Sequence, residues 1–182
     1  MNWKNTTTRY GSLSIGLHWL MLILFVAVYG TIELREIYEK GSDPREALKA
    51  WHFMLGMLVF VLVWLRIAAR VSGSTPVIRP APPKLQELAA KLVHLALYAL
   101  MIGMPLTGWL VLSAAGKPIP FFGFELPALI GENKELSKQI KEVHEIVGKT
   151  GYFLIGLHAV AALYHHFVVR DDTMTRMLPE QK

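Results

Sequence analysis

The feature that most constrains this 182-residue chain is a set of four long stretches without Asp, Glu, Lys or Arg. They cover residues 10–32, 50–65, 92–116 and 150–169, with lengths of 23, 16, 25 and 20 residues. About 20 apolar residues cross a bilayer as an α-helix. Three stretches meet that length. The second reaches it with residues 66–69, because the Arg66 side chain can extend to the membrane surface.

Helices are favoured over β-strands for all four stretches. Lipid offers the backbone no hydrogen-bond partner, so only helices and closed barrels cross a membrane. Barrel strands alternate apolar and polar residues over about 10 positions, and these stretches do not. The first is longer than the apolar core of a signal peptide and has no small-residue cleavage site after it. We therefore predict an all-α, transmembrane four-helix bundle in a single domain, residues 1–182, with helices near 10–36, 47–70, 86–115 and 133–170.

Composition supports a membrane protein and restricts its cofactors. Apolar and aromatic residues make up 53% of the chain and charged residues only 18%, against about 25% charged in soluble domains. The net charge of +5 is therefore interpreted as membrane anchoring, with lipid and not nucleic acid as the partner. Since there is no cysteine, disulfides, thiolate zinc sites, iron–sulfur clusters and covalently attached haem are excluded.

An even number of helices places both termini and the loop between the second and third helices on one side of the membrane. That side carries ten Lys and Arg residues, and the other side carries nine. Arg66 and Arg70 directly flank the second helix, and basic residues favour the cytoplasmic side. We predict that both termini are cytoplasmic. On the other side, residues 113–141 combine three prolines with three phenylalanines, which fits either a lid over a site or a loop anchored at the membrane surface.

The sequence has seven histidines, all in or within a few residues of the predicted helices: His18, His52, His94, His144, His158, His165 and His166. Ionisable residues in membrane helices are rare and usually mark functional sites. Any one histidine is explained equally well by a hydrogen bond between helices, but the set shows matched depths. In an antiparallel bundle, His18 lies roughly 12 Å and His158 roughly 16 Å from the inner edge.

His52 and His144 both fall at the outer edge of their helices. His144 and His158 are 14 residues apart in one helix, which is about 21 Å along the axis and within about 40° around it. They therefore face the same interior at two levels. Two haems stacked across a membrane need this arrangement, with one histidine on each side of each ring. We predict an inner haem b held by His18 and His158, and an outer haem b held by His52 and His144.

Glycines accompany the outer pair. His52 precedes Gly56 by four residues, and His144 precedes Gly148 by the same spacing. A glycine one turn from a ligand lets a flat ring lie against the backbone, although glycine also permits close helix packing in lipid.

Zinc is a weaker interpretation of the histidines. A zinc site needs three or four ligands that converge at one level, with a spacing such as H-E-x-x-H. The chain has no such motif, and the adjacent His165 and His166 point about 100° apart on a helix.

Two further histidines, His94 and His165, fall near the inner face, close to Arg66 and Arg70. Such groups can deliver protons to an electron acceptor such as a quinone. Alternatively, they hydrogen-bond each other or hold haem propionates together with the arginines. The residues themselves do not decide between these alternatives.

Several motifs together resemble the bacterial cytochrome b561 family, and within it the small stand-alone form that acts as a superoxide oxidase. They are S-I-G-L-H18-W, W-H52-F-M-L-G56, P105-L-T-G-W after His94, H144-E-x-x-G-x-x-G-Y-F-L-I-G-L-H158 and R170-D-D-T-M-T-R-M-L-P. The resemblance runs from about residue 9 to Pro179. Haem subunits of hydrogenases and formate dehydrogenases share part of the pattern.

This resemblance implies a bacterial inner-membrane superoxide:ubiquinone oxidoreductase that binds two haem b groups. It would take electrons from periplasmic superoxide and pass them to ubiquinone near the cytoplasmic face. His18 with His158 and His52 with His144 would be the haem ligands, while His94 and His165 fall where the quinone pocket would lie. The alternative is a haem b subunit that relays electrons between quinol and a periplasmic redox partner.

Overall fold

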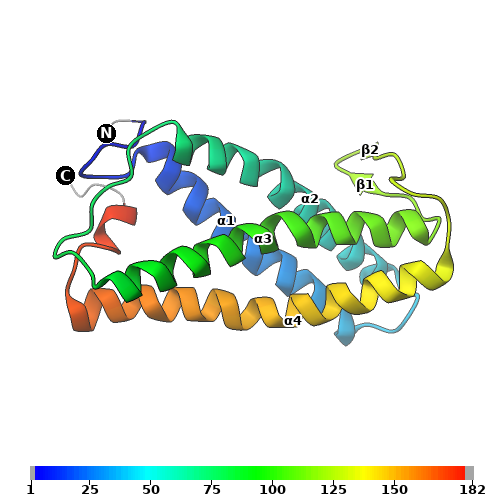
Figure 1. Ribbon diagram of the computed structural model, residues 1–182. Helices are drawn as coiled ribbons and strands as arrows, with labels where there is room; N and C mark the ends of the chain where they lie inside the picture. The colour runs from blue at the N-terminus through cyan, green and yellow to red at the C-terminus, as the bar shows by residue number, and fades with distance from the viewer. Residues whose placement is uncertain (1–2, 179–182) are drawn as a thin grey trace. The chain divides into compact units, whose positions relative to one another are not determined.

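The computed structural model describes residues 3–178 (Figure 1). The ends of the predicted domain, residues 1–2 and 179–182, lie outside the described residues. The elements are α1 (Ser12–Leu34), the 3-10 turn η1 (Arg35–Ile37), α2 (Asp43–Val71), α3 (Lys84–Ala114), β1 (Pro120–Phe121), β2 (Phe124–Glu125), α4 (Lys134–Tyr164), the π-helical turn η2 (His165–Val169) and the 3-10 turn η3 (Thr175–Met177).

Four helical segments are long and apolar enough to cross a membrane. They are Ser12–Ile37, Asp43–Val71, Lys84–Ala114 and Lys134–Val169, with 26, 29, 31 and 36 residues. The predicted all-α, transmembrane four-helix bundle is confirmed. Helix α2 begins at Asp43, upstream of the expected residue 47, because Pro44 occupies the first turn, where its missing N–H costs nothing.

Local chemistry at the helix ends explains where α3 stops and α4 starts. After α3 the chain turns at Gly116, whose φ of 63° lies in the left-handed region. The N–H of Gly116 donates to the carbonyl of Ser113, and the N–H of Lys117 donates to that of Leu112, which is the Schellman pattern. At the start of α4, Asn133 Oδ1 accepts a hydrogen bond from the N–H of Leu136 at 3.0 Å and so caps the helix.

The described chain forms two compact units. Unit 1 comprises the described residues of Met1–Leu20, Leu62–Leu100 and Thr150–Lys182, and unit 2 comprises Met21–Val61 and Met101–Lys149. Each unit contains a segment of all four long helices. A side chain on any one helix can therefore meet side chains from the other three within its own unit.

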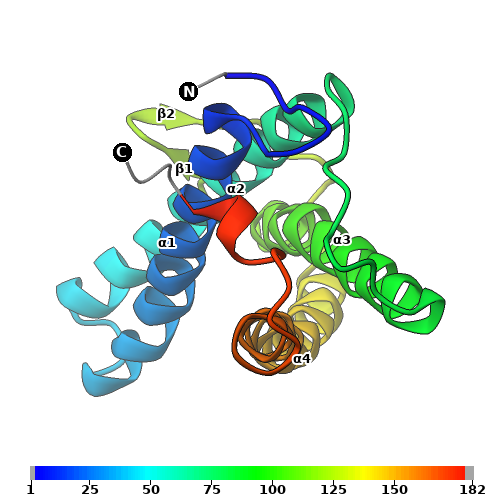
Figure 2. The same ribbon diagram turned by 90° about the vertical axis from the view of Figure 1, so that its left-hand side faces the viewer.

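In unit 1, the segment after α4 lies against the first turns of α1 (Figure 2). Trp19 Nε1 donates to the carbonyl of Met177 at 2.7 Å, and Arg9 donates to the carbonyl of Leu178 at 2.8 Å. The backbone N–H of Arg79, in the proline-rich connector, donates to Asp172 at 2.8 Å. These bonds tie three sequence-distant segments together at the ends of the unit 1 helices.

In unit 2, the loop between α3 and α4 contains a short antiparallel hairpin in which Pro120 pairs with Glu125. The ring of Phe122 packs edge-on against Trp51 of α2, with 6.3 Å between ring centroids. Phe124 on β2 is 75% exposed. The loop is therefore held to α2 by one aromatic ring and presents another outward.

We predict that Gly11→Ala destabilises the protein by about 1–3 kcal/mol through overpacking. A Cβ at Gly11 would lie 2.4 Å from the carbonyl oxygen of Trp3, and backbone cannot move away as a side chain can. Thermal unfolding in detergent measures the effect. Gly131→Ala is the matched control, because a Cβ there meets nothing within 4 Å. Equal melting temperatures for the two variants would contradict the prediction.

Candidate functional site

The histidines fall into two groups, one in each unit. His52 and His144 lie in unit 2, and His18, His94 and His158 lie in unit 1. Each group gathers rings from different helices, and all five rings are partly buried. Within each unit, the two histidines that the sequence analysis pairs lie next to each other: His18 and His158 in unit 1, and His52 and His144 in unit 2.

In unit 2, the His52 and His144 rings face each other across helices α2 and α4. Their ring centroids are 6.2 Å apart and their planes are 77° from parallel. His52 Nδ1 lies 3.0 Å from the carbonyl oxygen of Val28. Since a carbonyl only accepts, Nδ1 of His52 carries the proton, and in the neutral ring Nε2 keeps its lone pair.

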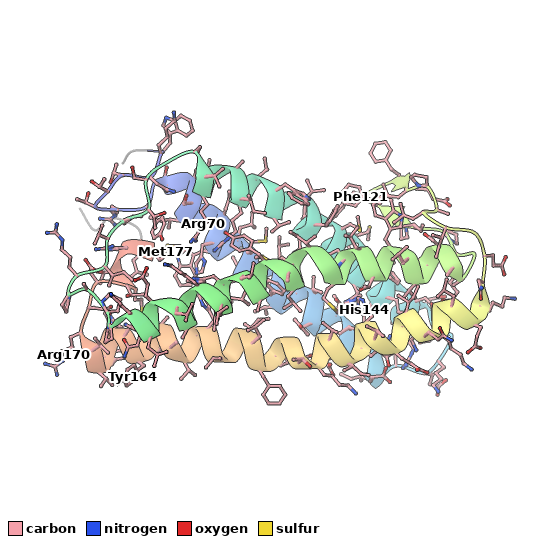
Figure 3. All side chains as sticks on the ribbon, in the orientation of Figure 1. Arg70, Phe121, His144, Tyr164, Arg170 and Met177 are labelled. Carbon is pink, nitrogen blue, oxygen red and sulfur yellow. The ribbon has the colours of Figure 1, made fainter. Side chains whose placement is uncertain are left out.

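His144, labelled in Figure 3, is held in the same tautomer by Thr107. The Thr107 hydroxyl donates to the carbonyl of Met104 at 2.8 Å. Its oxygen therefore accepts from Nδ1 of His144, which lies 2.8 Å away. Nε2 of His144 is left with a lone pair, as in His52.

Glycines flank this pair in different ways. A Cβ at Gly108 would lie 3.5 Å from Cε1 of His144, and a Cβ at Gly148 would lie 3.4 Å from Cε of Met104. A Cβ at Gly56 would meet nothing within 4 Å. Gly108 thus borders the imidazole directly, whereas Gly148 sits against a side chain of α3, as expected for close helix packing.

In unit 1, three histidines form a chain of rings. The centroids of His18 and His158 are 6.2 Å apart with planes at 64°. Those of His94 and His158 are 5.3 Å apart with planes at 69°. His94 therefore lies beside the predicted ligand pair.

Arg66 distinguishes the unit 1 group from the unit 2 pair. Its Nη2 lies 2.9 Å from Nδ1 of His18, and since a guanidinium only donates, Nδ1 accepts. Nε and Nη1 of Arg66 are buried and have no hydrogen-bond partner among the described residues. Buried donors of this kind suit an anionic group such as a carboxylate.

Arg70, labelled in Figure 3, is exposed. The structure thus places both predicted arginines in unit 1 with the histidines, and brings only Arg66 into hydrogen-bond contact with one of them.

His165 has other partners than those the helical pattern predicts. The α-helical geometry of α4 ends at Tyr164, and His165 begins the π-helical turn η2. Its Nδ1 donates to Oδ2 of Asp171 at 2.5 Å, and its ring meets that of Tyr164. Burial raises the pKa of Asp171, but hydrogen bonds from His165 and Thr173 outweigh burial and hold that pKa below its usual value.

The ring separations bear on metal binding. An imidazole bound at about 2.0 Å has its ring centre about 3 Å from the metal, so two imidazoles on opposite sides of one metal lie about 6 Å apart. Both predicted pairs show 6.2 Å. Within residues 3–178, no group of three or more His, Cys, Asp or Glu side chains is arranged to hold a metal ion. Each predicted pair thus has the spacing of two imidazoles bound to one metal.

Comparison with known proteins decides the family. The family model described as prokaryotic cytochrome b561 matches residues 9–180. The chain belongs to the prokaryotic cytochrome b561 family.

Three relatives align over nearly their whole length. The chain is 37% identical to "Cytochrome b561 homolog 1" of Escherichia coli (strain K12) over 174 residues, which are 96% of this chain and 99% of the relative. It is 35% identical to "Probable superoxide oxidase CybB" of Yersinia pestis, with 96% and 98% covered. It is 32% identical to "Cytochrome b561 homolog 2" of Escherichia coli (strain K12), with 98% and 95% covered.

Cytochrome b561 proteins bind haem b and transfer electrons, and the residues present fit that cofactor. Paired imidazoles are haem ligands, and unit 2 supplies two with their Nε2 lone pairs available. The unpartnered donors of Arg66 fit the carboxylates of haem b. One hydrogen bond must change, because ligation through Nε2 of His18 moves its proton to Nδ1, which then no longer accepts from Arg66.

Sequence reasoning missed the residues that orient the rings. The sequence pattern gives no role to Thr107 or Asp171, which orient His144 and His165. The acceptor for His52 is a backbone carbonyl, which no residue type reveals. For Thr107, the signal in the sequence is a hydroxyl in an otherwise apolar helix, next to Gly108.

We predict that Thr107→Val weakens haem binding by unit 2 by about 10- to 100-fold, as loss of a hydrogen bond to a metal-ligating histidine typically does. Valine keeps the shape but leaves Nδ1–H of His144 without its acceptor. Haem transfer to apomyoglobin measures the loss. Thr107→Ser keeps the hydroxyl and should retain haem, so equal haem loss from both variants would contradict the role of the hydrogen bond.

Proposed function

We propose that the protein binds two haem b groups, one per unit, with His18 and His158 as axial ligands in unit 1 and His52 and His144 in unit 2. The main support is the distance between ring centroids, which is 6.2 Å in both histidine pairs. When bound, haem iron supplies reversible one-electron chemistry. The chain itself ligates, orients and excludes water.

We further propose that it acts as a superoxide oxidase. Two superoxide anions lose one electron each and leave as O2, and one ubiquinone takes up the two electrons and two protons to become ubiquinol. The 35% identity to a relative named as a probable superoxide oxidase supports this assignment. The chemistry also fits, because oxidation of superoxide to O2 is a one-electron step and haem proteins transfer single electrons.

The proposed setting is the bacterial inner membrane, with both termini in the cytoplasm. Unit 1 holds the termini and the α2–α3 connector, where Lys and Arg outnumber the acids by ten to four. Basic residues concentrate on the cytoplasmic side. With four membrane-crossing helices, the α1–α2 and α3–α4 loops would then lie on the periplasmic side, where superoxide arrives.

Ubiquinone would be reduced beside unit 1. The His94 ring lies next to that of His158. A histidine beside the proposed haem ligand could supply a proton when the quinone is reduced. His165 differs, because Asp171 accepts the proton on its Nδ1 and leaves Nε2 as a hydrogen-bond acceptor. In this proposal His94 and His165 contact the quinone, and Arg66 and Arg70 hold haem propionates or the quinone.

A second function has one observation in its favour. The proposed periplasmic side carries ten acids against nine Lys and Arg residues, which does not attract a superoxide anion over long range. An electron relay between quinol and a periplasmic redox partner needs no such attraction.

We predict that His52→Ala and His18→Ala each remove one of two haems, because each substitution takes one axial ligand from a different pair. The pyridine haemochrome assay gives the haem-to-protein ratio. His166→Ala is the control, since its ring meets Phe167 and belongs to neither pair. An unchanged ratio in both ligand variants would refute the ligand assignment.

We also predict that the purified holoprotein reduces a ubiquinone analogue when superoxide is supplied and no other protein is present. Absorbance of the quinol reports the reaction, and superoxide dismutase should abolish it. Reduction that requires an added periplasmic redox protein would instead support the electron relay.

A further inference from the structure

We propose that Arg66 directs electron transfer by raising the reduction potential of the unit 1 haem above that of the unit 2 haem. This inference rests on the proposed function, which assigns the four axial histidines. Arg66 acts as a positioning residue through its charge, beside His18.

The first observation is that both unit 2 rings donate their Nδ1–H to neutral acceptors. Nδ1–H of His52 donates to the carbonyl of Val28, and Nδ1–H of His144 donates to the hydroxyl of Thr107. When Nδ1–H of an imidazole donates a hydrogen bond, the ring becomes a stronger electron donor to a metal bound at Nε2. Stronger donation favours the oxidised, more positive metal and lowers its reduction potential.

The second observation is the opposite arrangement in unit 1. The Arg66 guanidinium lies 2.9 Å from Nδ1 of His18, and the His158 ring packs between those of His18 and His94. When His18 ligates through Nε2, its Nδ1 becomes a donor, so Arg66 would act through its charge and not through this hydrogen bond. Reduction adds an electron near this fixed positive charge. A cation at such a distance, in partly buried surroundings, stabilises the reduced state.

Nearby carboxylates do not cancel this charge. Among residues 3–178, Arg66 forms no ion pair, whereas two charged residues of unit 2 do. Arg35 forms an ion pair with Glu36, and Glu145 forms one with Lys141. The acids of unit 1 that lie within residues 3–178 form ion pairs with other residues: Asp171 with His165, Asp172 with Arg176 and Glu87 with Lys91.

The direction of the effect does not depend on whether Arg66 also binds a haem carboxylate. If it binds none, its positive charge acts on the iron directly. If it binds one, it compensates a negative charge that would otherwise oppose reduction. In both cases loss of Arg66 lowers the potential.

The consequence is a downhill path. Electrons that enter at the unit 2 pair would move to the unit 1 pair, where the quinone is reduced. His144 and His158 both lie on α4, so one continuous helix carries a ligand of each pair. Arg66 thus makes transfer toward the quinone favourable.

Spectroelectrochemical titration of variants that hold a single haem tests this inference. In the His52→Ala background, which keeps the unit 1 haem, Arg66→Gln should lower the midpoint potential. We expect at least a tenfold change in the electron equilibrium, which equals 59 mV for a one-electron couple. Arg66→Lys should restore most of the potential, because it keeps the charge. Lys91→Gln removes an exposed charge of the same unit that is paired with Glu87, and it should leave the midpoint potential unchanged.

Two comparisons keep the inference falsifiable if Arg66→Gln fails to bind haem. The haem kept by His52→Ala should titrate at a higher potential than the haem kept by His18→Ala. In the His18→Ala background, Arg66→Lys and Arg66→Gln should leave the remaining potential unchanged. Equal or reversed potentials, or no response to Arg66→Gln in the His52→Ala background, would overturn the inference. A haem count that does not fall in the two histidine variants would instead refute the proposed function.

Discussion

Every polar side chain within the apolar helices must find its hydrogen-bond partner inside the protein, and the structure around the histidines depends on this constraint. Water is absent from a bilayer interior, so an unpartnered imidazole N–H there is costly. In unit 2 a backbone carbonyl and a threonine hydroxyl meet the requirement. In doing so they also decide which ring nitrogen keeps its lone pair, so one set of bonds both stabilises the rings and prepares them as ligands.

Unit 1 differs from unit 2 in the group that lies beside its histidines. A guanidinium approaches His18 where unit 2 offers only neutral acceptors. Two histidine pairs of equal 6.2 Å separation therefore have unequal electrostatic surroundings. Members of the cytochrome b561 family transfer electrons, and in the function proposed above this inequality would give that transfer a direction.

Much of this architecture follows from the sequence because lipid leaves few options. Long uncharged stretches must be helices, and the four helices appear where those stretches lie. The adjacency of His18 to His158, and of His52 to His144, follows from depth along antiparallel helices. His165 is the exception: its helical spacing from His158 assumes a regular α-helix, and the π-helical turn at His165 places it with Asp171.

The fold class and the absence of cysteine ligands can be read from the sequence, because hydrophobic length and residue type are local properties. The tautomers of His18, His52 and His144 and the groups beside these rings required the three-dimensional structure. Those depend on atoms from distant segments, such as the Val28 carbonyl beside His52 and the Arg66 guanidinium beside His18. A hydrogen bond is directional and short-ranged, so periodicity along one helix cannot specify its partner on another.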